Sequence, residues 1–208
     1  MIICWSAKGG SGTTVVACAL ALVLGRHRPT LLVDLAGDAP AALGLTEPTG
    51  PGVSDWTTSA MGDVEAIGRL STHVTGSVHL APRGSGPVPA ARIAHLYDAL
   101  AALDGEVIVD GGTDMPSPDL GASVTSLLVV RPCYLALRRA VTAGVTPTGV
   151  VVVHEPGRAL TSKDIARAIG APVVADVPFD PAIARAVDAG LLATRLPRSL
   201  EQGVEAFA

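Results

Sequence analysis

The segment from Ser6 to Thr14 combines glycines, hydroxyl residues and a lysine in an order that suits a bound polyphosphate. It reads Ser-Ala-Lys-Gly-Gly-Ser-Gly-Thr-Thr, so three glycines fall within the four positions after Lys8. Glycine lets the backbone approach an anion closely, and successive N–H groups at the start of a helix concentrate partial positive charge. Lys8 and Lys163 are the only lysines in the chain, so a lysine inside this loop indicates a specific task. In the alternative interpretation, the hydroxyl residues of a simple glycine turn only cap the following helix.

Two aspartates end apolar segments and could reach the same loop. Asp34 follows Leu-Leu-Val, and Asp110 follows Val-Ile-Val. Carboxylates at the carboxyl ends of parallel strands meet at one edge of the sheet, where they could support a bound Mg²⁺. Taken alone, each aspartate could equally be a strand-end carboxylate that caps or solvates a loop. Their joint placement favours a site for phosphate and metal.

Short, almost continuously apolar segments alternate with helical segments along the chain. Strands that are apolar on both faces suit a parallel sheet that is covered on both sides. We expect strands at residues 2–5, 30–34, 78–81, 106–110, 126–131, 149–154 and 173–177. We expect helices at residues 13–24, 89–103, 135–143, 162–169 and 181–189. This alternation predicts an α/β fold with a single doubly wound, mostly parallel β-sheet and helices on both faces.

The composition limits the function classes. A chain of 208 residues with 49% hydrophobic residues predicts one globular domain over residues 1–208 and excludes intrinsic disorder. The net charge of −4 gives no basic field over the whole surface for nucleic acid or an anionic membrane. Cys4, Cys18 and Cys133 lack metal-ligand spacing, so we expect small buried side chains in a reducing, cytoplasmic compartment. The apolar segment 15–24 is too short to cross a bilayer, and no segment predicts a membrane-targeting helix.

Four segments together resemble one known family. The sequence Lys8-Gly-Gly-Ser-Gly-Thr-Thr14 resembles the deviant Walker A motif, KGGxGK[ST][ST], of the ParA/MinD family of dimeric P-loop ATPases. Residues 31–34 resemble its second-strand switch segment, and residues 107–110 resemble its Walker B segment. Val-Pro-Phe-Asp at residues 177–180 is similar to the late segment that borders the adenine, and residues 180–190 continue that pattern. These motifs follow the family's order over nearly the whole chain.

The resemblance implies a P-loop nucleotide-binding domain that binds ATP and Mg²⁺ and forms a homodimer with ATP at the interface. Lys8 would reach across that interface to the phosphates of the partner's nucleotide. The Thr14 hydroxyl would bind Mg²⁺, and Asp34 and Asp110 would support the metal partly through water. The backbone of the loop would hold the phosphates, and a late segment would border the base. The residues implied for these two contacts are Gly9, Gly10, Ser11, Gly12, Thr13 and Thr14, with Pro178 and Asp180 beside the base.

Three positions depart from the family's pattern. Thr13 stands where other members keep the lysine that neutralises phosphate charge, which predicts weak or impaired ATP hydrolysis. Many members read Asp-x-Asp after the second strand, whereas here the second carboxylate is absent or displaced from Asp34 to Asp38. The adenine-side strand of many relatives ends in Asn, so His154 could take over that contact or could be a plain strand-end histidine.

The departure at Thr13, with Lys8 kept, most resembles the CpaE/TadZ branch, which is linked to pilus assembly and polar localisation. The favoured hypothesis is a nucleotide-dependent dimerisation switch that recruits a protein partner in positioning or assembling a cellular machine, such as a pilus, the septum or the chromosome. One alternative is a DNA-partitioning ATPase, which scattered arginines and low aromatic content disfavour. A pseudo-ATPase scaffold and an ATP-dependent ligase on the same scaffold are further alternatives. Loops at residues 44–62 and 82–89 are candidate partner surfaces.

Overall fold

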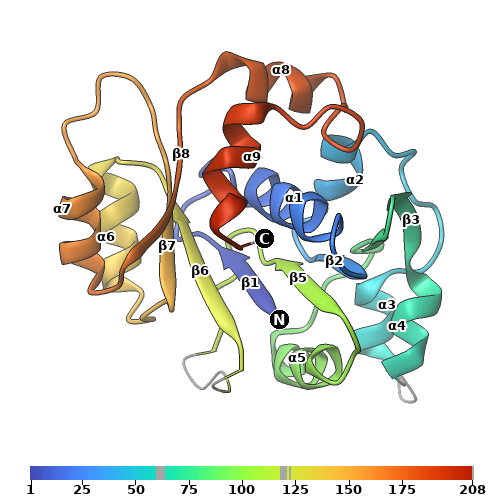
Figure 1. Ribbon diagram of the computed structural model, residues 1–208. Coiled ribbons are helices and arrows are strands. Elements are labelled where there is room, and N and C mark those ends of the chain that lie inside the picture. Colours follow the sequence, from blue (N-terminus) through green and yellow to red (C-terminus); the bar gives the residue numbers. More distant parts are fainter. Residues whose placement is uncertain (60–63, 118–120, 122, 208) are drawn as a thin grey trace.

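The computed structural model describes residues 1–59, 64–117, 121 and 123–207 (Figure 1). Within these residues the chain forms one eight-stranded sheet in the order β3-β4-β2-β5-β1-β6-β7-β8. All pairs are parallel except β3 with β4, which is antiparallel. The predicted α/β fold with a mostly parallel sheet is therefore confirmed. The strands are β1 (Ile2–Trp5), β2 (Thr30–Asp34), β3 (Thr72–Thr75), β4 (Val78–Ala81), β5 (Glu106–Asp110), β6 (Thr125–Val130), β7 (Gly149–Val153) and β8 (Val173–Val177).

Helices cover both faces of the sheet, and all four residues of β1 are therefore buried although its side chains alternate between the two faces. Ile2 and Cys4 pack into the core under α1, α2, α8 and α9, whereas Ile3 and Trp5 face the helices of the opposite side (Figure 1). None of the helices among the described residues is both long enough and apolar enough to span a bilayer. The helices are α1 (Thr13–Leu24), α2 (Ala39–Leu43), α3 (Val53–Thr58), α4 (Val64–Leu70), η1 (Ala90–Arg92), α5 (Ile93–Ala101), α6 (Tyr134–Thr142), α7 (Ser162–Ile169), α8 (Pro181–Asp188), α9 (Arg198–Val204) and η2 (Glu205–Phe207).

Helix α1 lies at the centre of one helical layer. Its sequence is apolar on all sides, and its residues from Val16 to Leu24 are all buried. A helix with this pattern needs cover all round. The sheet provides it on one side, and α2 and α9 provide it on the other, with Leu200 and Val204 of α9 in the same core. The N-terminus of α1 is therefore held rigidly at the carboxyl edge of the sheet.

Several elements differ from the sequence prediction. Strand β3 was not expected, because its residues are at most half-buried and carry little apolar pattern. Helix α3 forms inside the segment 44–62, where Trp56 is buried and the Asp55 carboxylate accepts a hydrogen bond from Gly52 N; residues 60–62 lie outside the described residues. The expected helix 89–103 is divided into η1 and α5. Cys4 and Cys18 are buried as expected, but Cys133 is only partly buried and lies at the N-cap of α6.

Candidate functional site

A cavity of about 440 Å³ opens where the β1–α1 loop meets the carboxyl ends of β2, β4 and β5. The topology brings these ends together because β1 lies beside β5, and β2 lies between β5 and β4. A crevice at the carboxyl ends of the strands is where open α/β sheets bind ligands. We call it the phosphate cavity. Its lining comprises Ser6, residues 9–15, Leu35, Ala36, Asp38, Arg83 and residues 111–114.

The glycine-rich loop of this cavity is held by its own backbone and by two serines. Gly10 and Gly12 have left-handed backbone conformations with φ of 76° and 94°, which favour glycine. The Ser11 hydroxyl donates to the Lys8 carbonyl at 2.7 Å, and the Ser6 hydroxyl donates to the same carbonyl at 3.0 Å. No side chain caps the N-terminus of α1, and its first turn carries no acidic residue. The hydroxyl residues therefore do not act as a helix cap here, and the helix end is free to bind an anion.

Asp110 lies buried beneath the loop with one oxygen unused. Its Oδ1 accepts a hydrogen bond from Gly112 N at 3.0 Å. Among the described residues, Oδ2 of Asp110 and Nε of Arg131 are the two buried side-chain polar atoms without a hydrogen bond. The Thr14 hydroxyl lies near the carboxyl group and favours its ionised form, although no hydrogen bond of normal geometry reaches Oδ2. Burial outweighs this contact and raises the pKa of Asp110 to about 6.

A buried carboxylate oxygen without a partner, beside a threonine hydroxyl and a helix N-terminus, fits a hydrated Mg²⁺ that bridges to phosphate. Mg²⁺ is commonly held by one or two protein oxygens, by water and by the phosphates of the ligand. The described residues contain no group of three or more His, Cys, Asp or Glu side chains arranged to hold a metal by themselves. The donor set therefore suits a metal that arrives with a nucleotide.

Asp34 lies directly opposite Asp110 in the β2–β5 pair, and its carboxylate holds the following turn. Its Oδ1 accepts hydrogen bonds from Ala36 N at 3.0 Å and Gly37 N at 2.7 Å, and its Oδ2 accepts from Ala39 N at 3.1 Å. Burial raises the pKa of Asp34, and these three N–H groups oppose that rise. The structure thus places Asp34 as the anchor of the turn before α2.

Asp38 and Lys8 have more exposed side chains. Asp38 lies within the turn that Asp34 holds, and it lines the phosphate cavity, so its carboxylate does reach this cavity. Lys8 contacts only the neighbouring Gly9 carbonyl, with Nζ at 3.4 Å, and makes no ion pair with a carboxylate among the described residues. Its charge lies close enough to Cys133 to contribute, after two backbone N–H bonds and Arg158, to lowering the pKa of that thiol.

A second cavity, of about 280 Å³, adjoins the phosphate cavity at Gly12 and Val15. Valine side chains from α1, β7 and β8 form much of its wall, and Phe179 lies at its rim with 57% of its surface exposed. A mostly apolar cavity with a few polar groups suits a nucleoside. We call it the nucleoside cavity. The predicted base-side residues His154, Pro178 and Asp180 all line it, together with Arg131, Glu155 and Ile183.

His154 and Glu155 of the nucleoside cavity are already paired. His154 Nε2 lies 2.6 Å from Asp176 Oδ1, which also accepts a hydrogen bond from Ser162. Glu155 forms ion pairs with Arg131 and Arg158, which lower its pKa. His154 thus follows β7 directly, and its ring is tied to β8.

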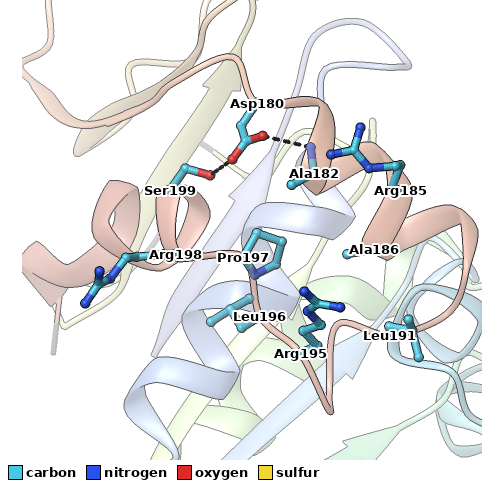
Figure 2. A pocket seen from close by; sticks show the side chains of 10 residues that line it. All are labelled: Asp180, Ala182, Arg185, Ala186, Leu191, Arg195, Leu196, Pro197, Arg198 and Ser199. Carbon is cyan, nitrogen blue, oxygen red and sulfur yellow. Dashed lines mark hydrogen bonds between the residues drawn. The ribbon is translucent and has the colours of Figure 1, made fainter.

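Asp180 stabilises the local backbone. Its Oδ1 accepts from Ala182 N at 2.8 Å and its Oδ2 accepts from the Ser199 hydroxyl at 2.6 Å (Figure 2). These bonds cap α8 and join it to α9, and the Ser199 bond is the main cause of the lowered pKa of Asp180. Figure 2 shows a further hollow of about 470 Å³ on the α8–α9 side of Asp180, where the side chain of Arg198 points away from Arg185 and Arg195.

Sequence reasoning missed two arginines at these cavities. Arg83 follows β4 and lines the phosphate cavity, and Arg131 follows β6 and lines the nucleoside cavity. Neither belongs to a motif with fixed spacing. Each follows an apolar strand directly or after one buried residue. This position at the carboxyl edge of the sheet is the sequence feature that could have identified them as cavity residues.

The chain is similar to known proteins in sequence family and in fold. Residues 2–193 match the model of the CobQ/CobB/MinD/ParA nucleotide binding domain. None of the curated protein sequences searched matches the chain. A ParA family ATPase from Chlorobium tepidum has a similar structure, with a TM-score of 0.77 and 21% identity over 98% of this chain and 94% of that chain.

Two MinD structures are also similar. The septum site-determining protein MinD from Pyrococcus horikoshii, complexed with Mg-ADP, gives a TM-score of 0.74 and 18% identity over 99% of this chain and 93% of that chain. The MinC:MinD cell division complex from Aquifex aeolicus gives a TM-score of 0.76 and 16% identity over 99% of this chain and 93% of that chain. At these sequence identities, the structural similarity establishes the shared fold alone.

Proposed function

The chain belongs to the CobQ/CobB/MinD/ParA nucleotide-binding domain family, and from this membership we propose that it is an ATP-dependent dimerisation switch. Residues 1–208 would act as one nucleotide-binding domain in the cytoplasm. Mg²⁺-ATP would join two copies, and the joined form would present a surface to a protein partner. ADP would leave the copies apart.

The observation that carries this proposal is the uncapped N-terminus of α1 beside the unused oxygen of Asp110. The backbone N–H groups of the loop are placed to bind phosphate oxygens. Thr14 and Asp110 would hold Mg²⁺, which neutralises phosphate charge when bound. Asp34 would keep the turn before α2 in place rather than contact the metal directly. The valine-lined nucleoside cavity would take the base and ribose.

Dimer formation is supported by the surface around Lys8. Lys8 has no carboxylate partner among the described residues, which suits a lysine that binds phosphate on a second copy, as in a deviant Walker A motif. Beside it, just after Cys133, Tyr134 and Leu135 are 71% and 55% exposed. Exposed apolar side chains next to an unpaired cation suit an interface that is covered in a dimer.

Slow hydrolysis follows from the residues at the phosphate cavity. Thr13 is buried in the loop and offers a neutral hydroxyl where a lysine would neutralise developing charge. Asp38, which lines the cavity together with Asp114, is the carboxylate that we propose orients a water molecule. We therefore propose that the ATP-bound state is long-lived, and that ATP binding, more than ATP hydrolysis, determines when the protein presents its surface to a partner.

The test is the mass of the protein in solution, measured by light scattering without nucleotide, with Mg²⁺-ADP and with Mg²⁺-ATP. We expect a dimer only with Mg²⁺-ATP, and Lys8→Ala should remain monomeric while still binding nucleotide. Lys163→Ala is the matched control, because Lys163 is the other lysine and is exposed on α7. A native chain that binds ATP without any change in mass would overturn the switch.

For the biological process, we propose a role in positioning or assembling a cellular machine, as in the CpaE/TadZ branch of pilus-assembly proteins. The MinC:MinD cell division complex among the similar structures supports a protein partner, and the net charge of −4 disfavours DNA. An electrophoretic shift of DNA that needs ATP and weakens with salt would favour the DNA-partitioning alternative. Absence of any nucleotide binding would favour the pseudo-ATPase scaffold.

A further inference from the structure

Arg83 is the only cation among the described residues that line the phosphate cavity. It faces the same cavity as Thr13 and Asp38, although it comes from the loop after β4. Its guanidinium forms no ion pair with a carboxylate among the described residues. The proposed function leaves this charge without a role, while the loop lacks a cation at Thr13.

The backbone of Arg83 is held in place by the N-terminus of α3. The Arg83 carbonyl accepts a hydrogen bond from Ser54 N at 2.8 Å, and the preceding Pro82 carbonyl accepts from Val53 N at 2.9 Å. Gly52 packs so closely that an added Cβ would meet the Pro82 carbonyl oxygen at 2.4 Å. The start of the side chain is therefore fixed relative to the sheet.

The side chain of Arg83 is directed across the turn that follows β2. Nη1 donates to the Ala36 carbonyl at 3.2 Å, and Cδ would lie 3.5 Å from a Cβ added at Gly37. A guanidinium has five N–H donors, so four remain after the bond to Ala36. Arginine can bind phosphate oxygens through two parallel hydrogen bonds, which a threonine hydroxyl cannot replace.

We propose that Arg83 binds the terminal phosphate of the nucleoside triphosphate and supplies the positive charge that Thr13 does not. This inference rests on the proposed nucleotide site and identifies what makes that site select a triphosphate. Through the Ala36 carbonyl, Arg83 also joins the terminal phosphate to the turn held by Asp34. The site then distinguishes ATP from ADP by a residue of the chain's own β4 loop.

Replacing Arg83 should weaken the binding of ATP much more than the binding of ADP. Hydrogen bonds to charged groups contribute about 1.5–3 kcal/mol, which corresponds to roughly a 10- to 150-fold change in affinity. Arg83→Gln should weaken Mg²⁺-ATP binding by this factor and Mg²⁺-ADP binding by less than about threefold, because ADP lacks the phosphate that Arg83 contacts. Arg83→Lys should keep part of the ATP affinity, since it retains the charge and loses the paired geometry.

The experiment is isothermal titration of ATP and ADP into the native chain, Arg83→Gln, Arg83→Lys, Thr13→Lys and the double variant Thr13→Lys/Arg83→Gln. A lysine returned to the loop should restore the ATP affinity that Arg83→Gln loses. Arg92→Gln is the matched control, because Arg92 also donates to a backbone carbonyl, that of Thr57 at 3.0 Å, and lies outside the cavity. Thermal melts of all variants report whether each one folds.

The outcomes separate this proposal from the proposed function. If Arg83→Gln binds ATP and ADP as the native chain does, the role of Arg83 is overturned and the switch is unaffected. Equal loss of ATP and ADP affinity, without rescue by Thr13→Lys, would also overturn it, since that pattern indicates damage to the cavity as a whole. If the native chain binds ATP but does not dimerise, the switch fails while the Arg83 result stands. A native chain that binds neither nucleotide overturns both.

Discussion

The two cavities of the site are built in different ways. In the phosphate cavity the groups that matter most are backbone N–H groups, left-handed glycines and two buried carboxylates. In the nucleoside cavity they are valines and partly exposed side chains such as His154, which is paired with Asp176, and Glu155, which is paired with arginines. Backbone geometry is fixed by the fold, whereas exposed ion pairs contribute about 0–1 kcal/mol each. The phosphate half is thus fixed by the backbone of the fold, and the nucleoside half is more adaptable.

This difference shows which half of the site destabilises the folded protein when no ligand is bound. Asp34 and Asp110 face each other across β2 and β5, and burial raises the pKa of both. A charge in such a place destabilises the empty protein and is relieved by a cation. The nucleoside half carries no comparable cost, because its carboxylates are exposed or paired. Substitutions on the two sides should therefore have opposite consequences for stability.

The largest effect should come from Asp110→Asn. The rise of the pKa of Asp110 from 3.8 to about 6 corresponds to about 3 kcal/mol of destabilisation by its buried charge at neutral pH. Asparagine keeps an oxygen for Gly112 N and carries no charge, so the variant without ligand should be more stable by up to about 3 kcal/mol at pH 7.5. Urea denaturation measures this, and stabilisation of the native chain by Mg²⁺-ATP should be lost in the variant.

Asp176→Asn is the control for that prediction. Asp176 also lies near the end of a strand but is exposed and paired with His154. Its replacement should change the free energy of unfolding by less than about 1 kcal/mol and in the unfavourable direction. If both variants behave alike, the contrast between the two cavities is wrong.

The pH dependence of the gain from Asp110→Asn tests its cause. Between pH 3.8 and about 6 the unfolded chain releases the proton of Asp110 before the folded chain does, so the native protein loses stability as the pH rises through this window. Asparagine does not titrate. The difference in stability between the two proteins should therefore be near zero at pH 3.5 and reach its full size above pH 7. A gain that is independent of pH would point to packing instead of charge.

A smaller effect is expected from Gly12→Ala. Its φ of 94° costs a non-glycine residue about 1–2 kcal/mol of stability. Gly157→Ala, with φ of 72° in the open loop after β7, should cost a similar amount. Calorimetric melting should place the two variants together, whereas nucleotide titration should separate them, because Gly12 borders both cavities and Gly157 borders neither. Equal nucleotide affinity in both variants would break the comparison.

Phe179→Ala should lower the affinity for nucleotide and leave the stability of the protein nearly unchanged. Phe179 is more than half exposed, so its removal should hardly change the melting temperature. Stacking on a base contributes about 0.5–1.5 kcal/mol, so affinity should fall about two- to tenfold. The loss should be equal for ATP and ADP, unlike the loss at Arg83. Leu191→Ala is the control, since Leu191 is also exposed and lies outside the nucleoside cavity; a selective loss of ATP binding in Phe179→Ala would contradict this division of roles.

The core of the fold was predictable because its strands are apolar on both faces. Segments such as Glu106–Asp110 and Gly149–Val153 indicate buried parallel strands, and the helices between them have periodic patterns. The parts that escaped prediction depend on contacts made in space. Strand β3 pairs at an edge with little apolar burial, and α3 forms because Trp56 is buried and Asp55 caps Gly52 N in a segment rich in turn residues.

The site likewise has a part that could be predicted from the sequence and a part that could not. The loop from Lys8 to Thr14 is one continuous segment, so its spacing indicated an anion site directly. The approach of Asp38 and Arg83 to the phosphate cavity depends on the order of β1, β5, β2 and β4, which no local pattern contains. The anchoring role of Asp34 depends on three backbone N–H groups that only the folded turn presents.

The central position of β1 also governs when the site can form during folding. Ile2 pairs with Ile108 on one side and Thr125 on the other, so both neighbours of the strand come from beyond residue 100. Closing such long loops costs conformational entropy before any contact repays it, and chains dominated by distant pairings fold slowly. The glycine-rich loop follows this strand directly. The glycine-rich loop can therefore reach its final position only when β5 and β6, from the middle third of the chain, have paired with β1.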